Sequence, residues 1–244
     1  MQILDDAKPG FVEADLVGHD GGNNSGNFIQ SLNFVDIATC WDIPVACKNK
    51  AQVHVFSAIK AASARFPFRI AGIDSDNGSE FINAHMLRYC IENKITFTRS
   101  REYKKNDNCF VEQKNYSIVR RAVGYSRYDT EEELSILNEL YIYLDHYTNY
   151  FQPVVKLVSK TRVGSRVTKK YDIAKTPFRR VLESEFIDDK IKERLKIQYD
   201  SLNPADLKKK ILGLQDKLLK LNVLKSKVRK DAVINEEAYG YITG

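Results

Sequence analysis

The sequence predicts an α/β fold in which a mixed five-stranded sheet is flanked by helices and followed by a basic C-terminal extension that ends in helices. Three observations predict this fold. Segments with strand and helix periodicity alternate through residues 10–150, 43% of the 244 residues are hydrophobic, and the balance of charge changes sign past the middle of the chain. The hydrophobic fraction is enough to bury a core, and an aromatic content of 11% argues against a disordered chain.

The first part of the chain has the pattern of three strands. Residues 10–17 mix apolar and acidic positions, and a turn rich in glycine and asparagine follows them. Residues 27–41 alternate with a period of two, which is typical of a strand. Asp42-Ile43-Pro44 predicts a turn into a third strand at residues 45–47. Together these segments predict an antiparallel meander.

Helices and strands alternate after the meander. One apolar face predicts a helix over residues 55–66, ended by Pro67. A buried strand at 69–74, a turn at 75–78, a helix capped by Ser79 and a strand at 95–98 come next. A polar loop at 100–107 leads into helices at 108–123 and 130–150. This order places helices on both faces of a mixed sheet, the pattern of a ribonuclease-H-like fold.

The charge of the chain is divided between its two parts. Up to Tyr150 there are 16 Lys and Arg against 20 Asp and Glu, a balance of −4; from Phe151 onward there are 22 against 12, a balance of +10. This division favours a protein that gathers cations at one site and grips a polyanion with another, although charge alone leaves a merely solubilising tail equally open.

Composition also divides the chain into three predicted parts. Residues 8–152 form the core domain. Residues 153–180 hold nine Lys and Arg with the single acid Asp172, which predicts a basic linker or a small DNA-contacting segment with a short strand at 154–158. Residues 181–244 predict a helical extension with a charged stretch at 182–199. Its last helix, after Pro204, carries an apolar stripe that predicts an oligomer or domain contact: Leu207, Ile211, Leu214 and Leu218.

Several classes of protein are disfavoured. The apolar runs are too short to span a bilayer, and the first residues lack the pattern of a signal peptide. The four cysteines form no Cys-x-x-Cys pair and the four histidines have no metal-ligand spacing, so we expect no structural zinc site. We expect free thiols in a reducing compartment, and therefore a cytoplasmic protein.

Three carboxylates are placed to share a site. Asp15 lies in the first strand, Asp76 just after the fourth, and Glu112 near the start of the helix at 108–123. In a ribonuclease-H-like sheet the first and fourth strands are neighbours, so these acids would meet at one edge. Their mutual repulsion requires a counter-charge, and oxygen ligands suit Mg²⁺ or Mn²⁺. The residues alone leave Glu13 open as a rival of Asp15, and Asp74 as a rival of Asp76.

Short sequence words around these acids carry a resemblance. They are Ser-Asp-Asn-Gly-Ser-Glu-Phe at 75–81 and Val-Glu-Gln-Lys-Asn at 111–115, with 35 residues between Asp76 and Glu112. This pattern resembles the Asp-Asp-Glu catalytic core of insertion-sequence transposases and retroviral-type integrases. The similarity covers residues 9–153 and continues in Lys-Lys-Tyr-Asp-Ile-Ala-Lys-Thr-Pro-Phe at 169–178.

The resemblance implies a function. Asp15, Asp76 and Glu112 would be the catalytic residues and the ligands of two Mg²⁺ or Mn²⁺ ions, in an enzyme that cuts DNA ends and joins their 3′-hydroxyls to target DNA. The implied partners are element ends, target DNA and further copies of the chain assembled on DNA, close to the nucleoid. Cationic and polar side chains near the site are the candidate DNA contacts, each with solvent exposure as its alternative: Lys104, Lys105, Lys114, Asn115, Arg120, Lys169 and Lys170.

Two other functions remain open from the sequence. Members of this family usually carry helical DNA-recognition domains before the core, whereas this sequence begins almost at the first strand. A non-catalytic DNA-binding remnant of a transposase is therefore the alternative. A nuclease acting on RNA–DNA hybrids would use the same metal chemistry, but the words around the acids fit integrases better.

Overall fold

The computed structural model describes residues 8–75, 78, 80–81, 84–99 and 109–240, with the backbone alone at 109 and 229–240. Its central sheet has the strand order β3-β2-β1-β4-β5. β1 pairs antiparallel with β2 and parallel with β4, so the predicted mixed five-stranded sheet and the predicted pairing of first and fourth strands are confirmed. The strand bounds are β1 (Phe11–Gly18), β2 (Gln30–Asp36), β3 (Asp42–Cys47), β4 (Gly72–Ser75) and β5 (Thr96–Arg99).

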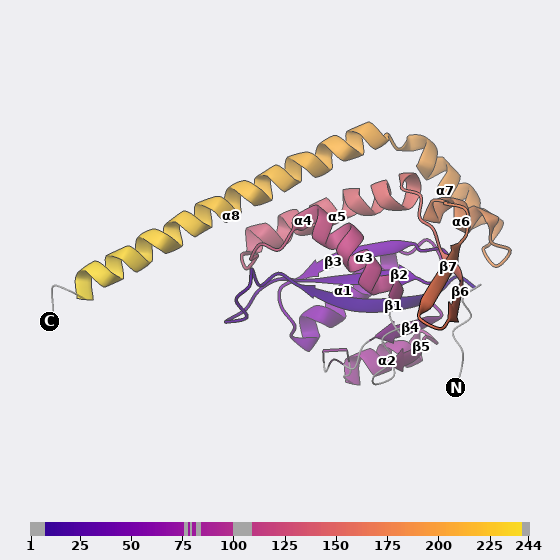
Figure 1. Ribbon diagram of the computed structural model, residues 1–244, viewed down its shortest axis with the longest axis horizontal. Helices are drawn as coiled ribbons and strands as arrows, with labels where there is room; N and C mark the ends of the chain where they lie inside the picture. The colour runs from indigo at the N-terminus through magenta and orange to yellow at the C-terminus, as the bar shows by residue number, and fades with distance from the viewer. Residues whose placement is uncertain (1–7, 76–77, 79, 82–83, 100–108, 241–244) are drawn as a thin grey trace.

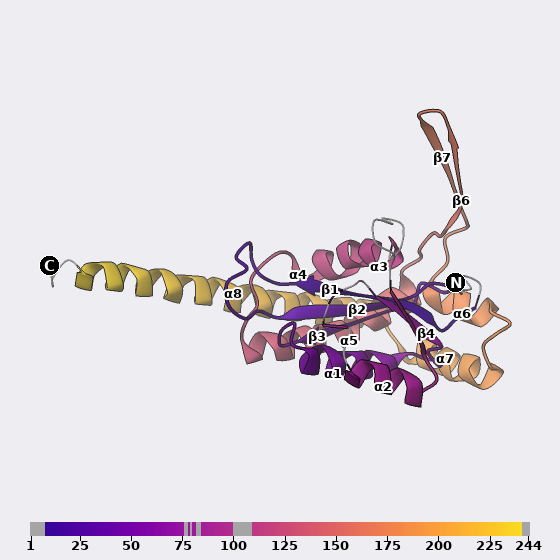
Figure 2. The same cartoon turned by 90° about the horizontal axis from the view of Figure 1, so that it is seen from below.

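Helices cover both faces of this sheet (Figure 2). One core cluster joins Val12 and Ala14 of β1 to α1 and α2, and the other joins Val17 of β1 to η1, α4 and α5. Alternate residues of a strand point to opposite faces, which is why one strand serves both clusters. The helix bounds are α1 (Gln52–Arg65), α2 (Ala84–Glu92), α3 (Cys109–Lys114), the π-helix η1 (Asn115–Arg120), α4 (Arg121–Val123) and α5 (Glu131–Phe151).

The turn between β2 and β3 differs from the prediction. The strand predicted over residues 27–41 ends at Asp36, and the turn predicted at residues 42–44 lies inside β3. The Asp36 carboxylate accepts hydrogen bonds from the backbone N–H of Thr39 at 2.8 Å and of Gly10 at 2.7 Å. Cys40 has a φ of 61°, which reverses the chain. Because a buried side chain makes this turn, strand periodicity could not reveal it.

The helix predicted over residues 108–123 is also modified. It runs from Cys109 to Val123, but its middle six residues form η1. A π-helical turn is wider than an α-helical one and is often found at functional sites. The change in helix type leaves no mark in the apolar periodicity.

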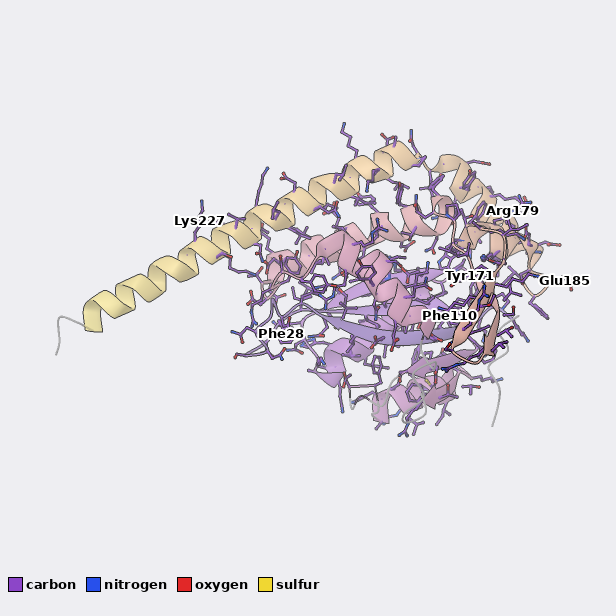
Figure 3. All side chains as sticks on the ribbon, in the orientation of Figure 1. Phe28, Phe110, Tyr171, Arg179, Glu185 and Lys227 are labelled. Carbon is purple, nitrogen blue, oxygen red and sulfur yellow. The ribbon has the colours of Figure 1, made fainter. Side chains whose placement is uncertain are left out.

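The C-terminal part begins with a second, two-stranded sheet and ends with three helices. They are β6 (Leu157–Val163), β7 (Arg166–Tyr171), α6 (Pro177–Glu183), α7 (Asp189–Ser201) and α8 (Pro204–Gly240). α8 runs alongside α5 and continues beyond the core, where Lys227 is labelled (Figures 1 and 3).

The apolar stripe of α8 makes a contact within the chain. Leu207 is buried, and Ile211, Leu214 and Leu218 share a buried cluster with α5. Lys225 fastens the next turns by donating to Glu133 at 2.6 Å and Asp129 at 3.0 Å. Of the two contacts predicted for this stripe, the structure therefore contains the intramolecular one. Along the described chain, no helix combines the length and apolar character needed to cross a membrane.

Asp42 is a fully buried acid at the start of β3. Asn149 of α5 brackets its backbone, accepting from the Asp42 N–H at 2.9 Å and donating to the Asp42 carbonyl at 2.8 Å. Within the described residues, neither oxygen of the Asp42 carboxylate meets a donor at full hydrogen-bond geometry. Burial raises the pKa of Asp42 to about 7, although the nearby Lys114 ammonium favours the charged form.

We expect the pKa of Asp42 to make stability depend on pH. The pKa is higher in the folded chain than in the unfolded one, so its stabilising effect is complete below about pH 4 and is lost as pH rises to about 7. Relative to Asp42→Asn, the free energy of unfolding should fall across that window by a few kcal/mol, since one pKa unit is about 1.4 kcal/mol. Urea unfolding of both proteins from pH 4 to 8 measures this, and parallel curves would contradict it.

Candidate active site

Glu13 and Asp15 lie on the same face of β1. Val12 and Ala14 point into the core on the α1 side, so the two acids between and after them point to the side of α3 and η1. Glu13 is 5% exposed, whereas Asp15 is only partly buried. The two candidates that the sequence left open therefore have different surroundings.

Glu13 caps the helix that carries Glu112. Its Oε2 accepts hydrogen bonds from the backbone N–H of Phe110 at 2.9 Å and of Val111 at 2.8 Å. These N–H groups lie in the first turn of α3, where no helical partner is available and the helix dipole favours a negative charge. The Glu13 carboxylate is therefore used to fix α3 against β1.

Asp15 is held by a chain of amides. Its Oδ2 accepts a hydrogen bond from the Asn115 Nδ2 at 2.7 Å, and the Asn115 Oδ1 accepts one from the Asn33 Nδ2 at 3.2 Å. Asn33 is the cross-strand partner of Asp15 on β2. The other carboxylate oxygen of Asp15 accepts the backbone N–H of Leu16 at 2.8 Å. Both of these donors are neutral, so they fix the direction of the carboxylate and neither cancels its charge.

Glu112 lies in the first turn of α3 and is exposed. The residue before it, Val111, is fully buried, so Glu112 follows directly after the anchor that seats α3 on the sheet. α3 packs against both β1 and β2. Asp15 and Glu112 are thus carried by elements in direct contact, on the same face of the sheet.

Asp76 lies outside the described residues. Its neighbour Ser75 is the last residue of β4 and pairs with Ala14, the residue before Asp15. Its rival Asp74 is 7% exposed, pairs in register with Glu13, and accepts a hydrogen bond from the Thr98 hydroxyl at 2.7 Å. Among the described residues, to which Asp76 does not belong, no three His, Cys, Asp or Glu side chains gather as metal ligands.

The predicted DNA contacts have varied surroundings. Lys114 is 8% exposed, and its ammonium partly offsets the rise that burial causes in the pKa of Asp42, so its charge is directed into the core. Arg120 donates to the Gly18 carbonyl at 2.9 Å and lies over the Tyr125 ring, which fastens the end of η1. Both side chains have structural roles here that their sequence positions did not reveal.

The remaining predicted contacts divide between two segments. Lys104 and Lys105 lie outside the described residues. Lys169 and Lys170 are exposed on β7. Asn115, predicted as a DNA contact, donates a hydrogen bond to Asp15 and accepts one from Asn33. No sequence pattern marks Asn33 as a site residue, because its role depends on the register between β1 and β2.

Comparison with known proteins places this geometry in context. Residues 5–105 match the family described as "Integrase core domain". The chain is 44% identical over 166 residues to "Uncharacterized protein y4rM" of Sinorhizobium fredii (strain NBRC 101917 / NGR234), covering 68% of this chain. The match covers 47% of that relative, so the chain spans about half the length of the curated relative it matches.

Solved structures with a similar arrangement are retroviral integrases. The catalytic core domain of BIV integrase has a TM-score of 0.48 at 16% identity, with 72% of this chain and 95% of that chain covered. The HTLV-2 integrase catalytic core domain in complex with magnesium has a TM-score of 0.46 at 14% identity, with 60% and 91% covered.

The sequence words around the acids and the match to a described family lead to the same group of proteins. Residues 5–105 of this chain match the integrase core domain, and the resemblance to integrase and transposase catalytic cores is confirmed.

Proposed function

We propose that this chain is the catalytic part of a DNA transposase or integrase, which cuts DNA ends and joins their 3′-hydroxyls to target DNA. One observation carries the proposal: β1 holds one predicted acid and orients the helix of another. Glu13 caps the helix of Glu112, while Asn115 from the same helical run fixes Asp15. The integrase core domain match supports this function.

The residues fit a hard divalent cation. Asp15 and Glu112, with Asp76, would give an oxygen-only set of ligands, which suits Mg²⁺ or Mn²⁺. The Asp15 carboxylate accepts hydrogen bonds from the Leu16 N–H and the Asn115 amide, and a carboxylate oxygen can accept more than one bond. When bound, two such ions would activate an attacking oxygen and stabilise the leaving one.

The surrounding residues keep the ligands in place. The Glu13 carboxylate is buried and accepts the backbone N–H of Phe110 at the α3 N-terminus. Asp15 is therefore the acid of β1 that is partly open to solvent. The partly buried amide of Asn115, held in turn by the buried Asn33, restricts the rotation of Asp15. Pre-positioning of this kind lowers the cost of bringing a phosphodiester and its nucleophile into line.

The proposal includes the partners of the reaction. The element's own DNA ends and the target DNA are the proposed substrates, bound by several copies of the chain in the cytoplasm near the nucleoid. Lys104 and Lys105, which precede Glu112 in sequence, and the exposed Lys169 and Lys170 remain the proposed phosphate contacts.

Replacement of Glu112 tests the chemistry. We expect Glu112→Gln to reduce nicking and strand transfer to background, because the amide supplies no charge to a bound cation. The assay uses duplex oligonucleotides taken from the DNA that flanks this gene, with Mg²⁺ or Mn²⁺ and a plasmid target.

Glu139→Gln is the matched control for this experiment, because Glu139 is an exposed acid on α5 outside the site. It should retain full activity. Activity of Glu112→Gln equal to that of the native chain would refute the proposed role. Inactivity of the native chain, together with DNA binding that does not need metal, would instead identify a non-catalytic DNA-binding remnant.

Asn115 is expected to act as a positioning residue for Asp15. Asn115→Ala removes the amide that holds the Asp15 carboxylate, and loss of such partners typically weakens metal binding or activity about 10- to 100-fold. We therefore expect the Mg²⁺ concentration for half-maximal strand transfer to rise by that factor.

Asn149→Ala provides the structural control, since Asn149 is a buried amide that holds the Asp42 backbone. This variant should lower the thermal unfolding midpoint and leave the Mg²⁺ requirement unchanged. If Asn115→Ala also lowers the midpoint without changing the Mg²⁺ requirement, Asn115 has only a structural role.

A further inference from the structure

The hairpin of β6 and β7 stands away from the body of the molecule (Figure 2). Every residue of both strands is exposed, so neither face of the hairpin packs on the core. Gly164, at a φ of 61°, lies in the turn that joins the strands. A two-stranded ribbon has little stability of its own in water. Its sequence therefore serves a purpose other than folding the core.

The charge of the hairpin is entirely positive. No Asp or Glu occurs from Leu157 to Tyr171. Lys160 and Lys169 are direct cross-strand partners and lie on the same face, and like charges in this relation destabilise a sheet. Within the described chain, no carboxylate forms an ion pair with any of the five cations of the strands: Lys160, Arg162, Arg166, Lys169 and Lys170. A polyanion would relieve this repulsion.

Both faces of the ribbon carry these cations. Alternation along β6 puts Arg162 on the face of Lys160 and Lys169, while the pairing of Val163 with Arg166 puts Arg166 on the other face. Lys170 shares that second face. The ribbon thus presents positive charge on both faces. A ribbon that bound its partner through one face would need cations on that face alone.

The base of the hairpin is firmly attached to the core. Arg180 donates to Asp172 at 2.6 Å and to the Val154 carbonyl at 2.8 Å. The Asp172 carboxylate also accepts the backbone N–H of Lys156 at 2.7 Å. Although burial alone would raise the pKa of Asp172, the hydrogen bonds and charges of Arg180 and Lys156 hold it below its usual value.

This attachment lies beside the candidate active site. The Lys156 ammonium donates to the Ala38 carbonyl at 2.9 Å and lies 5.8 Å from the ring centre of Phe110, two residues before Glu112. Figure 3 labels Phe110 at the start of α3 and Tyr171 at the end of β7. A duplex held at Glu112 would therefore lie within reach of the ribbon.

We propose that the β6–β7 hairpin is a DNA-binding arm that enters the major groove of the duplex on which the active site acts. The proposal rests on the function proposed above. A major groove about 12 Å wide admits a two-stranded ribbon, whose strands lie about 4.8 Å apart. Cations on both faces of the ribbon then reach the phosphates on both walls of the groove.

The salt dependence of DNA binding tests the arm. In the Lys160→Gln/Lys169→Gln variant we expect the slope of log affinity against log salt to fall by about 2, since each lost phosphate contact lowers it by about 1. Binding of a fluorescent duplex is followed by anisotropy without divalent metal. The control variant, Lys209→Gln/Lys217→Gln, removes two exposed lysines of α8 and should leave the slope unchanged.

Groove and strand preference complete the test. A major-groove ligand such as methyl green should displace the native chain, whereas a minor-groove ligand such as distamycin should not. The proposal is overturned if the hairpin variant keeps the native slope or if the α8 variant loses as much. It is also overturned if the hairpin substitutions weaken binding to single-stranded DNA or RNA as much as binding to duplex DNA.

The result can be separated from the proposed catalytic function. If Glu112→Gln loses strand transfer while the hairpin variant binds duplex DNA like the native chain, the arm is refuted and the catalytic function stands. If the hairpin variant loses its slope while Glu112→Gln retains strand transfer, the arm stands and the catalytic role of Glu112 is refuted.

Discussion

The arrangement of the site depends on the contact between the Glu13 carboxylate and the first turn of α3. This contact joins a central strand to the helix of Glu112 through two backbone N–H groups, those of Phe110 and Val111. A buried carboxylate needs such donors, and a helix N-terminus needs such an acceptor, so each group satisfies a demand made by the other. The position of Glu112 relative to β1 follows from this pairing.

The face of the sheet beside α3 contains further buried and partly buried polar groups that support one another. Asn33 and Asn115 link β2 to Asp15, while the Lys114 ammonium favours the charge of the buried Asp42. Lys114 and Asn115 are adjacent in sequence, at the junction of α3 and η1. Neighbouring residues of one helical segment thus stabilise the partly exposed Asp15 and the buried Asp42. Such networks specify a single geometry at some cost in stability.

The sequence predicts the sheet and the candidate acids because both leave local patterns. The period of two in β1 and the apolar face of α1 are visible in the chain, and the words around Asp76 and Glu112 carry the family resemblance. The structure confirms the fold class that these patterns predict, while the roles of the three acids stay a prediction. The match to the integrase core domain confirms the resemblance.

Other features could not be read from the sequence, for physical reasons. The amide chain through Asn33 exists only once β1 and β2 pair in register. The turn at Ile37–Trp41 is closed by the Asp36 side chain, which replaces the usual signals of glycine and proline. The β7 strand is exposed on both faces, so burial imposed no apolar alternation on it and its lysines resembled a linker.

The π-helix η1 sets the rotation of α3, which carries Glu112, relative to the helical residues that pack against α5. The N-terminal half is oriented by Glu13 and Asp15, while Ile118 and Val119 of η1 are oriented by the core shared with α5. In a regular helix of 3.6 residues per turn, one residue corresponds to a rotation of about 100°. The six-residue π-helical segment contains about one residue more than an α-helical segment that turns through the same angle. If η1 became a regular α-helix without losing a residue, the two halves would rotate by about 100° relative to each other, and with the apolar half in place Glu112 would turn away from the edge of the sheet. The wide turn therefore absorbs one residue and lets both halves keep their orientations.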